Sequence, residues 1–488
     1  MRPGATLALA AAAIFAVSAC GGGDAMPAGP QTDTTARPAR GTSGPPVRAA
    51  WPRFGLDASR TNASGAPVGI TAANVGRLRR VRLHVPGTVD SSPISLRGVR
   101  VAGAVRDVFV VTTTYGRTLA LDARGGRTLW TFTPRGIGAW EGSAQIATAS
   151  PVSDGRWVWA AAPDGRIHKL ALSDGTEVHD GAWPVALTRD PAHEKLASAL
   201  NLYRGSVLAV TGGYIGDIPP YQGHVAAIDG ASGRLRFVFN TLCSDRRELL
   251  DPPSCPATTS AIWARAGAVV EPGTGRILVA TGNGPFDGRT NWGDSVLELT
   301  PGGRLRQSWT PPDQASLAAT DTDLGSTAPA LIPHAGGTLA VQGGKDAKLH
   351  VLRLRRLEQV AELPAPGGGE VFTAPAVWRH GGTVRVFVAT SAGTAAYVVT
   401  AKAPYLRVGW ADGTAGTSPV VAGGLLYVYD PGGALNVYDP ARGRRLAHLA
   451  AAPGHWNSPV VASGRILVPE GNANAHATSG TLSLYVSR

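Results

Sequence analysis

Short runs of alternating apolar and polar residues, separated by turns rich in glycine and aspartate, extend along most of the chain. One complete unit places runs at residues 107–111, 118–122 and 128–132, with tight turns between them. Such a pattern predicts antiparallel β-strands, because alternate side chains of a strand point to opposite faces of its sheet. Trp130, in the last run, offers a flat apolar surface for packing against a neighbouring sheet. The pattern therefore predicts an all-β protein.

The units recur at a regular period. Four short phrases in the C-terminal half share a Ser or Thr followed closely by proline, and their prolines are 46, 44 and 40 residues apart. This period is typical of a four-stranded propeller blade. Seven units begin near Ser91, Ser150, Ser198, Ala266, Thr327, Thr373 and Thr417, and an eighth runs from Asn457 to Arg488.

The eighth unit holds too few residues for four strands. Residues 75–83, ahead of the first unit, have the pattern of a lone outer strand. If that strand completes the last sheet, the ring closes and no sheet edge remains open. We predict an eight-bladed β-propeller closed in this way. Seven blades are the alternative, if one weak unit is an insertion.

The N-terminus has the pattern of an export signal. A positive start and an apolar run predict a signal peptide over residues 1–19, which is too short to span a bilayer as a mature helix. The ending Val-Ser-Ala-Cys resembles the lipobox of bacterial lipoproteins, which implies lipidation of Cys20. A plain cleavable signal followed by an incidental cysteine is the alternative.

A Gly-, Pro- and Thr-rich segment follows the signal. Residues 20–50 then comprise the lipidated cysteine and a flexible tether, and residues 51–488 comprise the propeller. We expect an extracytoplasmic lipoprotein of the bacterial cell envelope, attached to the membrane through its lipid anchor.

Two further cysteines, Cys243 and Cys255, remain. Export places them in an oxidising compartment, so a disulfide that closes a short loop is expected, with two free buried thiols as the alternative. No Cys-x-x-Cys-His phrase for covalent haem occurs, and no His/Cys cluster has the spacing of a zinc site.

The formal net charge of +12 is carried mainly by arginine and is spread through the repeats. A basic surface favours anionic lipid headgroups or acidic polymers, but an ordinary solvated surface has the same appearance. Since the chain is exported, we expect no nucleic-acid partner.

The repeats resemble those of a known superfamily. Ala120, Asp122, Gly126 and Trp130 have a spacing similar to the tryptophan motif of pyrroloquinoline quinone (PQQ) enzymes. The chain is identified as similar to exported bacterial PQQ-binding-like propeller proteins of the quinoprotein alcohol dehydrogenase-like superfamily. The resemblance extends over residues 51–488, and its further segments are residues 51–57, 70–75, 212–225, 281–284 and 321–326.

The resemblance implies a candidate site. In the dehydrogenases, a calcium ion bound by a Glu, an Asn and an Asp holds PQQ at the centre of the ring, and an Asp is the base. Asn283 matches the Asn of the family's Thr-Gly-Asn phrase, and Asp321 or Asp323 matches the Asp. Lys345 resembles a lysine that contacts the quinone. Each of these residues also has a plainer interpretation as a turn, capping or surface residue.

Two departures weaken this site. The stretch equivalent to the family's Glu-Arg-Gly has Gln222 for the arginine and no Glu, and only Asp217 is available as a substitute ligand. The adjacent-cysteine ring that covers the quinone in many of these enzymes is missing. We therefore expect no cofactor, and PQQ with Ca²⁺ belongs to the alternative.

Two functions follow. The first is a monomeric propeller without catalysis, a binding or scaffold module that takes an envelope protein or a small ligand at one face. The alternative is a PQQ- and Ca²⁺-dependent oxidoreductase acting on alcohols or sugars. The loop between the two cysteines adds a hint of a ligand or cation site, because aromatic and acidic residues flank it: Trp263, Phe286, Asp287, Trp292 and Asp294.

Overall fold

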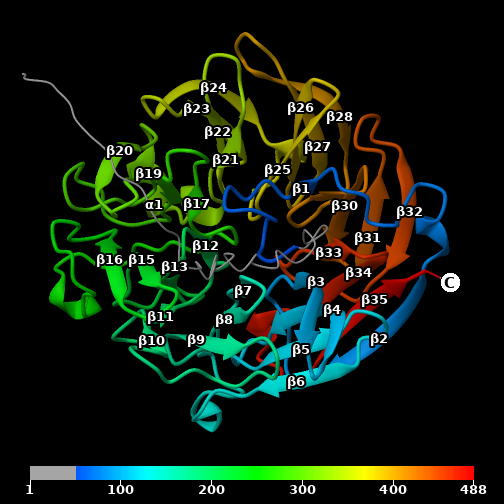
Figure 1. Ribbon diagram of the computed structural model, residues 1–488. Helices are drawn as coiled ribbons and strands as arrows, with labels where there is room; N and C mark the ends of the chain where they lie inside the picture. The colour runs from blue at the N-terminus through cyan, green and yellow to red at the C-terminus, as the bar shows by residue number, and fades with distance from the viewer. Residues whose placement is uncertain (1–50, 488) are drawn as a thin grey trace, which may run out of the picture. The chain divides into compact units, whose positions relative to one another are not determined.

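The computed structural model describes residues 51–487. The predicted signal peptide, the lipidation of Cys20 and the tether lie outside these residues. The described residues form eight four-stranded antiparallel sheets arranged as a ring (Figure 1). The prediction of an eight-bladed propeller is confirmed, and the seven-bladed alternative is excluded.

Each blade follows the chain from an inner strand near the hub to an outer strand at the rim. Blade 1 comprises β3 (Ile94–Val101), β4 (Ala104–Thr112), β5 (Thr118–Asp122) and β6 (Thr128–Phe132), and blade 2 comprises β7 (Val152–Ser153), β8 (Trp157–Ala161), β9 (Arg166–Ala171) and β10 (Val185–Ala186). Blade 3 comprises β12 (Asn201–Tyr203), β13 (Ser206–Val210), β15 (His224–Asp229) and β16 (Leu235–Asn240), and blade 4 comprises β17 (Val269–Val270), β18 (Ile277–Ala280), β19 (Val296–Leu299) and β20 (Leu305–Trp309).

Blades 5 to 7 continue the same order. Blade 5 comprises β21 (Ala330–Ile332), β22 (Leu339–Gly343), β23 (Lys348–Arg353) and β24 (Glu358–Pro364). Blade 6 comprises β25 (Ala376–His380), β26 (Thr383–Ala389), β27 (Thr394–Val399) and β28 (Leu406–Asp412). Blade 7 comprises β29 (Val420–Ala422), β30 (Leu425–Asp430), β31 (Ala434–Tyr438) and β32 (Arg445–Ala450).

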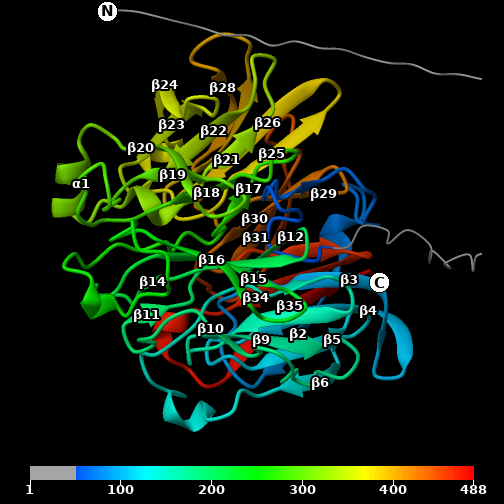
Figure 2. The ribbon, with the colours of Figure 1, turned by 60° about the vertical axis from the view of Figure 1, so that its left-hand side comes forward.

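Blade 8 closes the ring with a strand from the N-terminal side. Its inner strands are β33 (Val460–Ala462), β34 (Arg465–Glu470) and β35 (Gly480–Val486), and its outer strand is β2 (Arg79–Val85), which pairs with β35 over its whole length. These strands lie side by side in both views (Figures 1 and 2). The predicted closure is confirmed, although β2 begins four residues later than expected because residues 75–77 form a 3₁₀ turn.

The repeated Ser/Thr phrases bond one blade to the next at the inner strands. The Ser92 amide donates to Ser150 Oγ (2.8 Å), and the Ser458 amide donates to Ser92 Oγ (2.9 Å). In the same way the Ala374 amide donates to Ser418 Oγ (3.0 Å). All of these hydroxyls are buried. The Ser/Thr phrases that recur in the sequence therefore form a belt of hydrogen bonds around the hub. This belt holds in place the connections that lead into the inner strands.

Aromatic side chains pack across the blade faces nearer the rim. The ring of Trp130 lies over Gly175 of blade 2, where a Cβ atom would come within 2.6 Å of it, and its Nε1 donates to Leu172 O (2.9 Å). Trp410 repeats this contact with Gly443 of blade 7. The hydrophobic cores accordingly lie between adjacent blades, and each spans strands of neighbouring sheets.

A segment ahead of the first blade crosses the hub. The Arg60 guanidinium is 3% exposed and donates to three carbonyl oxygens, two of them at Ala199 and Leu200 of blade 3. β1 (Ala63–Ser64) then pairs in parallel with β29. This segment therefore connects the region just ahead of blade 3 with blade 7 across the hub.

The remaining elements are short. Among residues 51–487 no helix is long and apolar enough to cross a membrane. The described elements outside the blades are the ribbon of β11 (Glu194–Lys195) and β14 (Gly212–Gly213), the helix α1 (Gln314–Ala319), and 3₁₀ turns at Val75–Arg77, Ile137–Ala139, Pro252–Ser254, Leu324–Ser326, Pro366–Gly368 and Ala473–Ala475.

Candidate functional site

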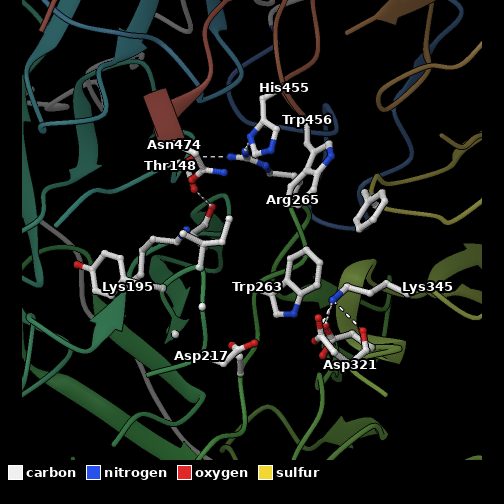
Figure 3. A pocket seen from close by; sticks show the side chains of 18 of the residues that line it. Thr148, Lys195, Asp217, Trp263, Arg265, Asp321, Lys345, His455, Trp456 and Asn474 are labelled. Carbon is white, nitrogen blue, oxygen red and sulfur yellow. Dashed lines mark hydrogen bonds and ion pairs between the residues drawn. The ribbon is translucent and has the colours of Figure 1, made fainter. Parts of the chain in front are cut away.

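A cavity of about 560 Å³ lies at the hub. Its wall is made by the connections that enter the inner strands of most blades, together with the β22–β23 turn and the loop between β34 and β35 (Figure 3). Because each connection is fixed by the belt of Ser and Thr hydroxyls, side chains far apart in sequence converge there.

Most of the residues predicted from the sequence lie at one wall of the cavity, which Asp321, Asp323 and Lys345 line. Lys345 Nζ lies 2.6 Å from Asp323 Oδ2 and 3.0 Å from Asp321 Oδ1. The Asn283 amide donates to Asp323 Oδ1 (2.6 Å), and Asn283 Nδ2 donates to Asp321 Oδ1 (3.3 Å). We call these four residues, with the neighbouring Asp294, the Lys345 cluster.

The glycine of the Thr-Gly-Asn phrase has a packing role in this cluster. A Cβ atom at Gly282 would collide with the Asp323 carboxylate. The absence of a side chain therefore lets the two connections approach closely, and it brings the amide of Asn283 to that carboxylate.

The cluster holds more carboxylates than cations. Burial raises the pKa of Asp323, and the attraction of Lys345 only partly opposes it. Asp294 is fully buried; one carboxylate oxygen accepts from the Leu324 amide (3.1 Å) and the other has no hydrogen-bond partner among the described residues. Burial, helped by the charge of Asp323, raises the pKa of Asp294 to about 7.

The opposite wall carries an ion pair that the sequence analysis missed. Arg265 Nη2 donates to Asp90 Oδ1 (2.7 Å), and its Nη1 donates to Thr148 O (3.2 Å). A hydrogen bond of 2.8 Å joins His455 Nδ1 to Asp90 Oδ2. Burial alone would raise the pKa of Asp90, but Arg265 and His455 together outweigh it and lower that pKa. We call these residues the Arg265 cluster.

Lys195 lines the cavity from the β11–β14 ribbon. Its neighbour Glu194 is buried and faces the other way, where its carboxylate accepts from the Gln222 amide (2.9 Å) and lies 3.2 Å from His224 Nε2. Lys195 is half-buried, and its Nζ lies 5.8 Å from the centre of the Tyr214 ring. Within residues 51–487 it makes no hydrogen bond or ion pair. Burial and the charge of Arg265 lower the pKa of Lys195 to about 8.

Three aromatic rings lie between these two clusters. Phe372 and Trp456 stack with centroids 4.7 Å apart, and Trp263 contacts Trp456 at 5.5 Å. Lys345 Nζ lies 5.5 Å from the Trp263 ring, and the Arg265 guanidinium lies 5.9 Å from the Trp456 ring. The cavity thus combines flat apolar surface with charges of both signs.

Asp217 also lines the cavity, but it lies on an exposed loop between β14 and β15. Its carboxylate accepts a hydrogen bond of 2.8 Å from the hydroxyl of Tyr221. Gln222, which stands where the family has an arginine, is buried. The structure therefore brings Asp321, Asp323 and Lys345 into direct contact and leaves Asp217 on a separate loop.

The donor set does not fit the calcium ion that the resemblance implies. Calcium takes six to eight oxygen ligands, with carboxylates prominent among them. Here the ammonium of Lys345 contacts both Asp321 and Asp323, and no Glu accompanies Asn283. Among residues 51–487 no group of three or more His, Cys, Asp or Glu side chains has an arrangement that could hold a metal ion.

The predicted disulfide is confirmed: Cys243 and Cys255 are bonded, with an S–S distance of 2.01 Å. The aromatic and acidic residues around that loop do not form a single patch. Trp263 lines the cavity, whereas Trp292 donates from Nε1 to Ser244 Oγ (2.9 Å) on the loop itself. Asp287 accepts from the amides of its own turn.

One signal in the sequence could have identified the missed residues. Several of them come just before a Ser/Thr phrase: Asp90 precedes Ser91, and His455 and Trp456 precede the phrase of blade 8. Since that phrase begins each inner strand, the positions ahead of it face the hub.

Comparisons with known proteins agree with this architecture. A family described as outer membrane protein assembly factor BamB matches residues 62–241. No curated protein matches the chain.

Solved structures match over most of the chain. Quinohemoprotein alcohol dehydrogenase from Comamonas testosteroni is 16% identical, with a TM-score of 0.64 over 90% of this chain and 80% of that one. A europium-containing methanol dehydrogenase is also 16% identical, with a TM-score of 0.66 over 90% of this chain and 98% of that one. At this identity the likeness shows the fold alone. The family match over residues 62–241 and the shared eight-bladed ring make the chain similar to PQQ-like β-propeller proteins.

Proposed function

We propose that this protein is a non-catalytic binding protein of the bacterial cell envelope that holds a small organic molecule in its hub cavity. The cavity itself carries the proposal: about 560 Å³ is within the range of small-molecule sites, roughly 300–1,000 Å³. The three aromatic rings offer flat apolar surface, and the Lys345 and Arg265 clusters flank them with fixed charges.

The envelope location rests on the N-terminal sequence. A signal peptide over residues 1–19 and lipidation of Cys20 would attach the propeller to the membrane through the tether. The match to a family described as an outer membrane assembly factor supports the same location and a protein partner at one face. Membrane fractionation tests this step: Cys20→Ser should move the protein from the membrane to the soluble fraction, and no change in its distribution would contradict the anchor.

The oxidoreductase alternative needs a carboxylate base and a metal-bound quinone at the Lys345 cluster. Asp323, the carboxylate that would act as the base, is instead paired with the ammonium of Lys345. The set of calcium ligands is also incomplete. The binding function needs only the cavity, so it is the one that the contacts favour.

Tryptophan fluorescence and thermal unfolding of the full-length protein test the binding function, with benzyl alcohol as the probe. We expect saturable quenching and a rise in Tm, because a ligand that binds only the folded state stabilises it by mass action. Trp263→Ala should abolish both effects. Trp157→Phe, in blade 2, is the matched control and should retain them.

Two outcomes would contradict the proposal. The first is a response to benzyl alcohol that is unchanged in Trp263→Ala. The second is dye-linked alcohol oxidation that requires PQQ and Ca²⁺ and is lost in Asp323→Asn, which would establish the oxidoreductase instead.

A further inference from the structure

Lys195 has a reactive group that the proposed binding function does not use. The β11–β14 ribbon holds its backbone, and the burial of Glu194 on the opposite face directs the Lys195 side chain to the cavity. Figure 3 shows it beside the cavity, across from Lys345. The position of the amine is therefore set by rigid structure.

The other lysines make Lys195 distinctive. The chain has only five, and two of them line the cavity. Lys345 is paired with two carboxylates, and outside the cavity Lys348 pairs with Glu362 (3.3 Å) while Lys169 donates to Ala231 O (3.0 Å). Lys195 is the cavity lysine that has no such partner among the described residues.

The charges around Lys195 favour its neutral form. Burial and the Arg265 guanidinium disfavour the ammonium form of Lys195. Asp90 and Asp217 favour the ammonium form, but their effect is smaller. The Tyr214 ring lies 5.8 Å from Nζ. A lysine desolvated beside another cation is a recognised way to obtain a nucleophilic amine near neutral pH. A substantial fraction of Lys195 is then uncharged at pH 7.5.

We propose that Lys195 forms an imine with an aldehyde or ketone group of an aromatic molecule bound in the hub cavity. The neutral Nζ attacks the carbonyl carbon, a C–N bond forms, and the carbonyl oxygen leaves as water with the two hydrogens that Nζ gives up. No oxidant or reductant takes part. The inference rests on the proposed function, since the aromatic part of the molecule packs on the rings that line the cavity.

Reductive trapping on the full-length protein tests the imine. Benzaldehyde and sodium cyanoborohydride at pH 7.5 convert an imine into a stable benzylamine, and peptide mass spectrometry then follows each of the five lysines. We expect Lys195 to be labelled on the order of a hundredfold faster than the exposed Lys402. The reason is that lowering a lysine pKa from 10.5 to about 8 raises the neutral fraction by about that factor.

The comparison is internal to the wild-type protein, so it does not depend on a variant. Lys348→Arg, outside the cavity, is a matched control that should leave the labelling of Lys195 unchanged, whereas Lys195→Arg should remove the fast phase. Labelling of Lys195 that is no faster than that of Lys402 would overturn the inference. If benzyl alcohol still binds in that case, only the imine fails; if it does not bind either, the proposed function fails as well.

Discussion

The two walls of the hub cavity differ in the balance of their charges. In the Arg265 cluster one guanidinium faces one carboxylate, Asp90. In the Lys345 cluster one ammonium pairs with two carboxylates, Asp321 and Asp323, and the charges of Asp323 and Lys345 also act on a third, the buried Asp294. Asp90 and Asp294 are equally buried, at 1% and 0% exposed, yet the pKa of Asp90 is lowered and that of Asp294 is raised.

This contrast shows what burial alone does not decide. Desolvation raises the pKa of both carboxyl groups; at Asp90 the contacts with Arg265 and His455 reverse the shift, and at Asp294 no such contact does. The Arg265 cluster is therefore a charge-balanced structural pair. The Lys345 cluster keeps an acid that titrates near neutral pH, so the two walls should respond differently to mutation and to pH.

The largest expected effect is that of breaking the balanced pair. Arg265→Ala leaves Asp90 buried without its cation, and removing one partner of a buried pair costs about 3–5 kcal/mol. Urea unfolding at pH 7 should show this loss in the free energy of unfolding. Asp90→Asn combined with Arg265→Met should recover part of it, because no buried charge then remains.

Lys345→Met is the matched change on the other wall. It should cost less, since Asp323 keeps the amide of Asn283 as a donor and is more easily protonated. Equal losses for Arg265→Ala and Lys345→Met would show that the two walls do not differ in the way that their charges indicate.

The ring could be predicted from the sequence because its information is local. The strands of a blade follow one another along the chain, and the turn residues and the Ser/Thr phrase recur at a regular spacing. Even the closure followed from local patterns, since the last unit was short by one strand and residues 75–83 supplied a spare one. The disulfide followed in the same way from two cysteines left in an exported chain.

The two walls were not equally predictable. Asn283, Asp323 and Lys345 lie in short phrases that resemble a known family, so they could be identified one by one. Asp90, Arg265 and His455 are brought together only by the closed ring. The local sequence around Arg265 does not predict that this arginine pairs with an aspartate 175 residues earlier. Long-range pairs of this kind depend on the register of the whole propeller.

The next effect concerns pH and the unbalanced wall. Asp294 has a folded pKa of about 7, above the ordinary value of 3.8. Its charged form is thus penalised in the folded state, and stability falls as pH rises from about 4 through 7. Asp323 and Lys345 face it and partly offset each other. Asp294→Asn removes this dependence and should gain about 2–3 kcal/mol over the wild type between pH 5 and pH 8.

Urea unfolding at these two pH values measures the gain. Asp217→Asn, on the exposed loop, is the control and should leave the pH dependence unchanged. If the wild type and Asp294→Asn lose stability in parallel between pH 5 and pH 8, the raised pKa is not a property of Asp294.

The smallest expected effect separates the two lysines of the cavity. The folded pKa of Lys195, about 8, lies below the ordinary 10.5, so its ammonium is penalised and stability rises as pH increases from 8 towards 10.5. Lys195→Met should therefore stabilise the protein at pH 6, by about 1 kcal/mol because the side chain is only half-buried, and the gain should vanish by about pH 10. Lys345→Met should destabilise it in the same thermal unfolding series, since Asp323 and Asp321 then lose their cation.

Opposite signs for the two substitutions are the sharpest test of the contrast, because both remove one positive charge from the same cavity. A loss of stability in Lys195→Met at pH 6 would mean that Lys195 has an ionic partner after all, and it would remove the basis for a reactive amine at this position.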